Sequence, residues 1–257
     1  MPRKRLFFDI ETSPNIALTW RTGYKISLSH DNILKERAII CICYKWEGEE
    51  KAHALTWSKS QDDKSMLQKF AKVISKADEV VGHNGDRFDI KWLYTRCLYH
   101  KIKINPEIKT IDTLKVARSK FYFNSNKLDY IAQFLGHGGK MDTGGFALWK
   151  SIVLDKCKKS LDKMVEYCKT DVVILEKVFK DIEYYSKPKT HYGVLNGGQK
   201  YSRPCCGHNR PVLNMTRTTA SGVVKRLMKC KNSKCNKYYT ISNKAYQDLL
   251  TDRLKGN

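Results

Sequence analysis

The sequence has little glycine, proline or acidic character, and it has no long hydrophobic run. With 15 glycines, 6 prolines and 11% aromatic residues in 257, it is neither collagen-like nor low-complexity nor wholly disordered. No apolar stretch approaches the roughly 20 residues that span a bilayer. Acidic residues interrupt the short apolar stretch near the N-terminus, so we expect no signal peptide there. We therefore expect a folded, cytoplasmic protein that has no membrane partner.

Negative charge is scarce, and the positive excess is uneven. The chain has 48 Lys or Arg against 26 Asp or Glu, a formal net charge of +22. From residue 186 onward there are 15 basic and only 2 acidic residues, so this part carries most of the excess. Such a field attracts polyanions and releases their counterions. It favours a nucleic-acid partner over a merely well-solvated surface.

Hydrophobic patterns in the first part of the chain predict a mixed α/β fold. Short apolar runs at 5–12, 38–46 and 51–57 predict three opening strands in a meander. Helical spacing follows at 60–77, and a long helical pattern covers 159–185. Strand and helix signals alternate between them. This order predicts an α/β domain with a mixed β-sheet flanked by helices.

Composition changes after this first part and predicts a second, smaller domain. We expect the α/β domain over residues 1–185. The Gly-, Pro- and polar-rich stretch 186–202 lacks periodicity and predicts a linker. Residues 203–257 would form a small domain that ends in a helix.

Several acidic residues occur inside apolar runs, which requires an explanation in so basic a chain. Asp9 and Glu11 are two residues apart on the first expected strand, so both side chains leave the same face. Neighbouring carboxylates repel each other, and a divalent cation between them removes the repulsion. The alternative is that one of them faces solvent at the strand end. Asp89 follows another expected strand, and Tyr167 and Asp171 share one face of the long helix.

Three short motifs occur in order: FDIET, then Asn84-x-x-x-Phe88-Asp89, then Tyr167-x-x-x-Asp171. They resemble the three exonuclease motifs of the DEDD superfamily, which has the RNase H-like fold. The tyrosine of the third motif resembles that of the DEDDy branch. The segment SNKLDYIAQFLG, between the second and third motifs, resembles the same region in proofreading domains of family B DNA polymerases.

The resemblance covers about residues 5–185 and implies a metal-dependent 3′–5′ exonuclease that acts on DNA. It implies that four carboxylates bind two Mg²⁺ or Mn²⁺ ions, which together hold the attacking and leaving oxygens. It also implies a tyrosine beside the attacking water, and two residues of the second motif that support the site or the terminal nucleotide. In that order these residues are Asp9, Glu11, Asp89 and Asp171, then Tyr167, then Asn84 and Phe88.

The 9 cysteines do not suggest a disulfide framework, because their number is odd and we expect a reducing compartment. Cys41 and Cys43 share one face of an expected strand and are interpreted as small core hydrophobes. The tail contains four more cysteines at short spacings, in the pattern Cys-Cys-Gly-His, then 21 residues, then Cys-x₄-Cys. This layout resembles the small zinc ribbons of transposases and other nucleic-acid proteins.

We predict one structural Zn²⁺ in the tail, which a segment with so small a core needs in order to fold. The favoured ligands keep a two-residue gap in the first pair, and the adjacent Cys206 could replace either member of that pair. The alternative is a set of unligated thiols. The favoured ligands are Cys205, His208, Cys230 and Cys235.

The basic tail suggests phosphate contacts, for which we select Arg217, Lys225 and Arg226. The leading hypothesis is an exonuclease whose zinc ribbon helps to hold DNA, which we expect as partner rather than RNA, in a replication or repair complex. One alternative is a structure-specific endonuclease or RNA-processing nuclease of the same fold. Another is a non-catalytic nucleic-acid-binding adaptor, although the complete motif set argues against it. The two-part build suggests a bacterial or bacteriophage source.

Overall fold

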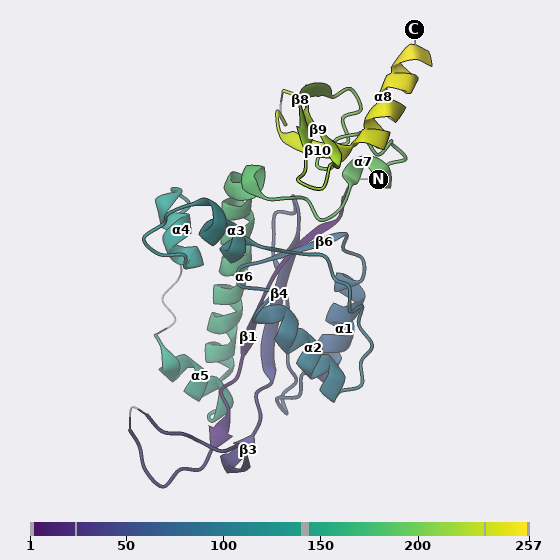
Figure 1. Ribbon diagram of the computed structural model, residues 1–257. Helices are drawn as coiled ribbons and strands as arrows, with labels where there is room; N and C mark the ends of the chain where they lie inside the picture. Colours follow the sequence, from purple (N-terminus) through teal and green to yellow (C-terminus); the bar gives the residue numbers. More distant parts are fainter. Residues whose placement is uncertain (1–2, 24, 140–143, 234, 256–257) are drawn as a thin grey trace. The chain divides into compact units, whose positions relative to one another are not determined.

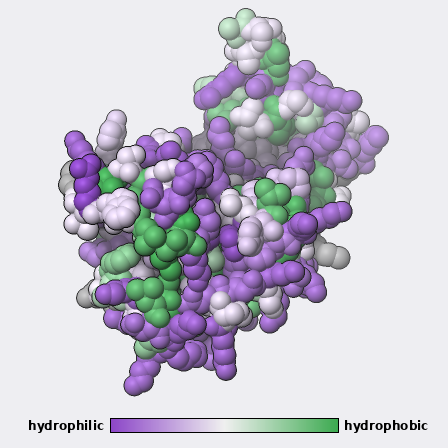
Figure 2. Space-filling view, turned by 90° about the horizontal axis from the view of Figure 1, so that it is seen from below, coloured by the Kyte–Doolittle hydropathy of each residue, from purple (hydrophilic) through white to green (hydrophobic). Residues whose placement is uncertain are grey.

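The chain divides into two compact units in the computed structural model, Lys4–Tyr185 and a second unit formed from Ser186 onward (Figure 1). None of the described helices combines the length and hydrophobicity that a membrane span requires. Figure 2 shows a mostly hydrophilic face with separate hydrophobic patches. The structure describes residues 3–23, 25–139, 144–233 and 235–255.

A five-stranded mixed sheet forms the centre of the first unit. Its first three strands in space form an antiparallel meander, and the last two are parallel to the central strand. This arrangement confirms the predicted mixed α/β fold. In spatial order the strands are β5 (His53–Thr56), β4 (Ile39–Trp46), β1 (Arg5–Thr12), β6 (Glu79–Gly82) and β7 (Thr110–Asp112). A separate ladder pairs β2 (Ile16–Ala17) with β3 (Ile33–Lys35).

Helices cover both faces of the sheet because successive β1 side chains alternate between two hydrophobic cores. Leu6 and Phe8 belong to the core that contains α1 (Lys64–Ile74) and α2 (Asp89–Tyr99). Phe7 belongs to the opposite core, where its ring lies 5.6 Å from that of Phe179. The remaining helical elements are η1 (His30–Asn32), α3 (Thr113–Lys120), α4 (Leu128–Phe134), α5 (Phe146–Val153), α6 (Lys158–Ile182) and η2 (Glu183–Tyr185).

A buried carboxylate, Asp63, fixes α2 against the start of β4. It accepts hydrogen bonds from the Ile39 N–H at 2.9 Å, from two Arg96 nitrogens at 2.8 and 2.9 Å, and from the His100 ring at 2.6 Å. Burial acts to raise the pKa of Asp63, but the bonds from Arg96, Ile39 and His100 outweigh it and hold the pKa below its usual value. This network therefore fixes the helix that begins at Asp89.

The described residues of the second unit form a three-stranded antiparallel sheet and two helices. A small core of Tyr201, Met228, Tyr239, Ile241, Ala245 and Leu249 joins the sheet to the last helix. So few buried side chains supply little stability without a further cross-link. In spatial order the strands are β10 (Tyr238–Ser242), β9 (Val224–Lys229) and β8 (Val212–Thr218), and the helices are α7 (Tyr192–Leu195) and α8 (Asn243–Lys255).

Candidate active site

Two carboxylates extend from the half of β1 that lies beyond its parallel partner. β6 pairs with β1 only from Arg5 to Phe7, so Asp9 and Glu11 follow the end of that pairing. On the other side they lie opposite Cys43 and Cys41 of β4. Both carboxylates are half-buried and share the face of β1 that turns toward α6.

A tight turn after β6 brings the third carboxylate, Asp89, to the same place. A Cβ on Gly82 would lie 3.1 Å from the Cα of Gly85, so this close approach favours glycine. Asn84 between them has a φ of +64° and accepts the Phe88 N–H, which closes the turn. Asp89 then begins α2.

Asp89 is bound directly to the strand that carries the first two carboxylates. Its Oδ1 accepts the backbone N–H of Ile10 at 3.0 Å, between Asp9 and Glu11 in the sequence. Burial raises the pKa of Asp89 well above its usual value, and the negative charge of Asp9 adds to the rise. The bond from Ile10 opposes it, and Glu11 contributes a smaller increase. Because burial and repulsion make a third negative charge unfavourable here, a bound cation would stabilise the site.

The long helix α6 brings Tyr167 and Asp171 to the same region. It packs along β1 and β4, and the Sγ of Cys168 lies 3.5 Å from both the carbonyl oxygen and Oδ2 of Asp9. Asp171 is 3% exposed and lies three residues beyond Cys168, on the same face of the helix. Tyr167 lines a pocket together with Asp9.

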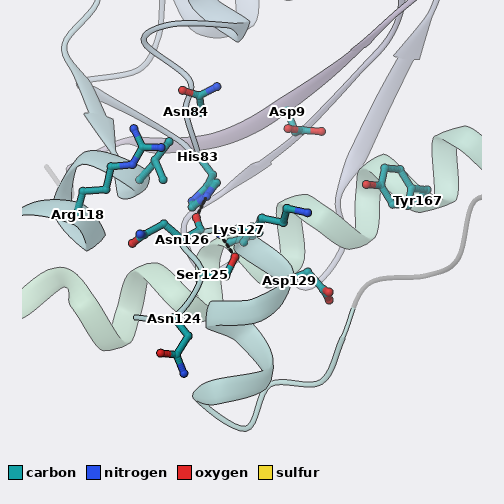
Figure 3. Close-up of a pocket in the computed structure, with 12 residues that line it drawn as sticks. Asp9, His83, Asn84, Arg118, Asn124, Ser125, Asn126, Lys127, Asp129 and Tyr167 are labelled. Atoms are coloured by element: carbon teal, nitrogen blue, oxygen red, sulfur yellow. Dashed lines mark hydrogen bonds between the residues drawn. The ribbon is translucent and has the colours of Figure 1, made fainter. Parts of the chain in front are cut away.

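This pocket has a volume of about 700 Å³ and combines three of the predicted residues, Asp9, Asn84 and Tyr167 (Figure 3). In Figure 3 the amine end of Lys127 points toward the space beside Asp9 and Tyr167. The remaining lining is mostly polar and includes none of the predicted site residues. It consists of His83, Leu114, Arg118, Asn124, Ser125, Asn126, Leu128 and Asp129.

His83 holds the polar wall of the pocket in position. Its Nδ1 lies 2.9 Å from the Thr113 hydroxyl, and its Nε2 lies 2.9 Å from the Asn126 carbonyl oxygen. The loop before α4 is therefore attached to the turn after β6. The segment SNKLDYIAQFLG, whose resemblance was noted above, begins in this wall, and it was the available signal for these residues.

Two features of the structure differ from the predicted site: the position of Phe88 and the spacing of the carboxylates. Phe88 does not line the pocket among the described residues; it packs against the core on the α1 and α2 side. Asp9, Glu11 and Asp89 are close enough to affect one another electrostatically, but within the described ranges no three carboxylates bring oxygens within 4.8 Å of one another. Their oxygens would have to move closer together in order to share an ion.

In the second unit, the tail cysteines converge. The Sγ atoms of Cys205, Cys206 and Cys235 lie within 4.8 Å of one another. Cys205 and Cys235 are 3.4 Å apart, and Cys206 is 3.7 Å from Cys230. The ring of His208 is not part of the group. The two-residue gap favoured His208 as a ligand, with Cys206 as a substitute, whereas in the structure the Sγ of Cys206 lies close to those of the other cysteines.

Three of these sulfurs each accept a hydrogen bond from the backbone N–H of the residue two positions later in the chain. Such bonds favour the thiolate form and act to lower the thiol pKa, although burial outweighs them at Cys206, whose pKa is raised to about 12. Arg203 adds a guanidinium N–H 3.0 Å from the Sγ of Cys205. The three pairs are Cys206 with His208, Cys230 with Asn232, and Cys235 with Lys237.

The three basic residues selected in the tail have different surroundings. Arg217 and Lys225 are exposed and lie opposite each other on β8 and β9. Arg226 is half-buried and donates two hydrogen bonds to Asn243, at 3.0 and 2.9 Å. Its guanidinium also lies over the ring of Tyr246 at 4.9 Å. Arg217 and Lys225 are therefore better placed to contact phosphate than Arg226.

A family model of the RNase H superfamily matches residues 6–183, and the chain belongs to this superfamily. Its members are generally nucleases and typically use divalent metal ions. One similar solved structure is the family B DNA polymerase from the hyperthermophilic archaeon Pyrobaculum calidifontis, with 14% identity and a TM-score of 0.55. The likeness covers 72% of this chain and 25% of the polymerase, and it shows the fold alone. No curated protein gives a significant match.

Proposed function

We propose that the chain is a metal-dependent 3′–5′ exonuclease of the DEDDy type that acts on DNA. The observation that carries this proposal is the convergence at the end of β1: Asp9 and Glu11 on the strand, and Asp89 bonded to it through Ile10. Tyr167 borders the same pocket from α6. The match to the RNase H superfamily and the similar polymerase fold are consistent with this chemistry.

The residues present fit Mg²⁺ or Mn²⁺. The donor set of Asp9, Glu11, Asp89 and Asp171 is entirely carboxylate, which these hard cations prefer. The raised pKa of Asp89 reflects burial and the charge of Asp9, and a bound cation would relieve both costs. When bound, a pair of such ions would stabilise negative charge on the attacking and leaving oxygens.

Side chains of the pocket would hold the 3′ end of the DNA and the attacking water. The phenol of Tyr167 would hydrogen-bond the attacking water and orient it toward the phosphorus, a role that needs no ionised tyrosine. Lys127 and Arg118 line the pocket and would hold the phosphates of the terminal nucleotides. A volume of about 700 Å³ suits a single-stranded end better than an intact duplex.

For the second unit we propose a zinc ribbon held by Cys205, Cys206, Cys230 and Cys235. This proposal replaces His208 with Cys206, because the Sγ of Cys206 lies 3.7 Å from that of Cys230 and belongs to the cysteine group. Thiolates are preferred Zn²⁺ ligands, and N–H groups that face their sulfurs are consistent with that role.

The ribbon would provide a second, sequence-independent contact with DNA. Arg217 and Lys225 are exposed side by side on β8 and β9. Replacing both by alanine should remove about two phosphate contacts. The slope of log affinity against log salt concentration should then become shallower by about 2. Fluorescence anisotropy at several salt concentrations measures this slope. An unchanged slope would remove these two residues from the DNA contact.

The exonuclease proposal is tested with single-stranded DNA labelled at its 5′ end. In Mg²⁺ we expect a ladder that shortens from the 3′ end, whereas a substrate with a blocked 3′ end should stay intact. Internal cuts in the blocked substrate would instead support an endonuclease. Cleavage of RNA alone would overturn the choice of DNA.

A pair of variants on one helix tests the site itself. Asp171→Asn should abolish Mg²⁺-dependent cleavage and leave DNA binding intact, because it removes a charge from the proposed metal site. Asp181→Asn is the matched control: Asp181 is on the same helix and pairs with His137 at 2.5 Å, outside the pocket. Near-wild-type activity of Asp171→Asn, or equal loss in both variants, would contradict the assignment.

A further inference from the structure

Three buried cysteines form a second thiol group, inside the first unit. Cys41 and Cys43 lie on one face of β4, and Cys168 approaches from α6, which lies along β1 and β4 (Figure 1). The three Sγ atoms lie within 4.8 Å of one another, and all three side chains are fully buried. The proposed nuclease chemistry uses none of these thiols.

This cysteine group directly adjoins Asp9. The Sγ of Cys168 lies 3.5 Å from Oδ2 of Asp9, and Cys43 is the register partner of Asp9 across β1 and β4. Asp9 in turn lines the 700 Å³ pocket. Asp9 therefore contacts both the pocket and the buried cysteine group.

We propose that Cys41, Cys43 and Cys168 form a binding site for a thiophilic cation, Zn²⁺, with the Asp9 carboxylate as the fourth ligand. Zn²⁺ bound to sulfur at about 2.3 Å in a tetrahedron places the sulfurs about 3.8 Å apart, and the three Sγ atoms here lie within 4.8 Å of one another. Each thiol would release its proton to solvent and bind as a thiolate. Mg²⁺ would not compete for this position, because it prefers oxygen ligands.

The proximity of Cys168 to Asp9 supplies the reason for a shared ion. The thiol of Cys168 donates toward Oδ2 of Asp9 at 3.5 Å, so a sulfur and a carboxylate oxygen already lie close enough to bind one ion. A cation bound to both groups would take the place of the thiol proton between them. Cys97 provides a contrast within the same chain: it is buried on α2, belongs to no such group, and acts as a core side chain.

The consequence for activity rests on the proposed exonuclease function. Zn²⁺ in this site would hold Asp9 away from the Mg²⁺ position and inhibit cleavage. The site would therefore make the enzyme sensitive to free Zn²⁺ through three buried cysteines, which bind the ion together with Asp9.

The binding part is tested on the full chain by native mass spectrometry with Zn²⁺. We expect the wild type to bind one more Zn²⁺ than Cys43→Ala, whatever the tail binds. Cys97→Ala, which removes a buried thiol from outside the group, should match the wild type. Equal Zn²⁺ counts in all three proteins would overturn the site.

If Cys43→Ala does not fold, a measurement on the wild type alone still tests the proposed metal site. Cadmium titration reports thiolate ligands through their ultraviolet charge-transfer absorption. We expect a second bound Cd²⁺ with thiolate absorption, beyond that bound by the tail. A single thiolate-bound Cd²⁺ per chain would overturn the site, and so would a disulfide within the group under reducing conditions.

The inhibitory role is tested by measuring the rate of cleavage in Mg²⁺ with and without buffered Zn²⁺. The ratio of the two rates is then compared between the proteins. We expect Zn²⁺ to inhibit the wild type and Cys97→Ala at a concentration about tenfold lower than it inhibits Cys43→Ala. Equal sensitivity would overturn the inhibitory role. If no protein cleaves DNA in Mg²⁺ at all, the proposed nuclease function fails, while the binding result stands by itself.

Discussion

Replacing Asp89 by asparagine should have opposite effects on stability with and without metal. The amide oxygen can still accept the Ile10 N–H that Asp89 accepts at 3.0 Å. The substitution removes a buried charge that faces Asp9 and Glu11. Without metal the variant should therefore be more stable than the wild type by about 1–2 kcal/mol, as is typical when strain in an active site is relieved.

The expected melting temperatures follow from the size of the first unit, Lys4–Tyr185. For about 180 residues, 1 kcal/mol corresponds to about 2–4 °C, so Asp89→Asn should melt about 2–8 °C higher in EDTA. Mg²⁺ at 100 times its Kd stabilises the wild type by about 2.7 kcal/mol, or about 5–11 °C. The variant should gain much less, so the order of the two melting temperatures reverses in Mg²⁺.

The pH dependence gives the same prediction a second test. Because the pKa of Asp89 is raised in the folded protein, the folded state binds more protons than the unfolded state between about pH 4 and that raised pKa. Wild-type stability in EDTA should fall as pH rises through this window. The advantage of Asp89→Asn should grow over the same range and vanish below about pH 4.

Scanning calorimetry in EDTA and in Mg²⁺ measures both effects. Asp86→Asn is the control, because Asp86 lies in the same turn but pairs with Lys115 at 2.6 Å. It should show no reversal. A lower melting temperature for Asp89→Asn in EDTA, or an equal Mg²⁺ gain in both proteins, would refute the electrostatic account of the site.

Other predictions concern the scaffold, the water and the tail. Asp63→Ala should lower the unfolding free energy by about 3–5 kcal/mol in urea, because Arg96 loses a buried partner; a loss under about 1 kcal/mol would contradict this. Tyr167→Phe should reduce kcat by about 10-fold or more with little change in KM, and a change confined to KM would mean that the phenol only binds substrate. A zinc chelator should remove amide protection in the second unit alone; unchanged protection there would exclude a structural metal.

Local sequence pattern predicted the parts of the site that lie on regular elements. The alternation along β1, from which we expected Asp9 and Glu11 to share a face, also holds for its apolar residues: Leu6 and Phe8 lie in one core and Phe7 lies in the other. The two glycines at and just after the end of β6 indicate a turn, but the Asn84 to Asp89 spacing does not show how tight that turn is. The close approach of these two glycines depends on how β6 meets α2, and pattern alone does not specify that packing.

The contacts that sequence reasoning did not find join segments that are distant in the chain. Interpreting Cys41 and Cys43 as core side chains agrees with their burial, but the approach of Cys168 depends on how α6 packs across the sheet. In the tail, spacing could not decide between Cys206 and His208. The left-handed Gly207 between them, with a φ of +71°, reverses the chain so that Cys206 faces the other cysteines.

The most direct test of the central claim is to locate Mn²⁺ in crystals of the full chain by anomalous diffraction. The account predicts two neighbouring ions, bound by oxygens of Asp9, Glu11, Asp89 and Asp171. Ions bound elsewhere, or no ion at these carboxylates at saturating Mn²⁺, would contradict it.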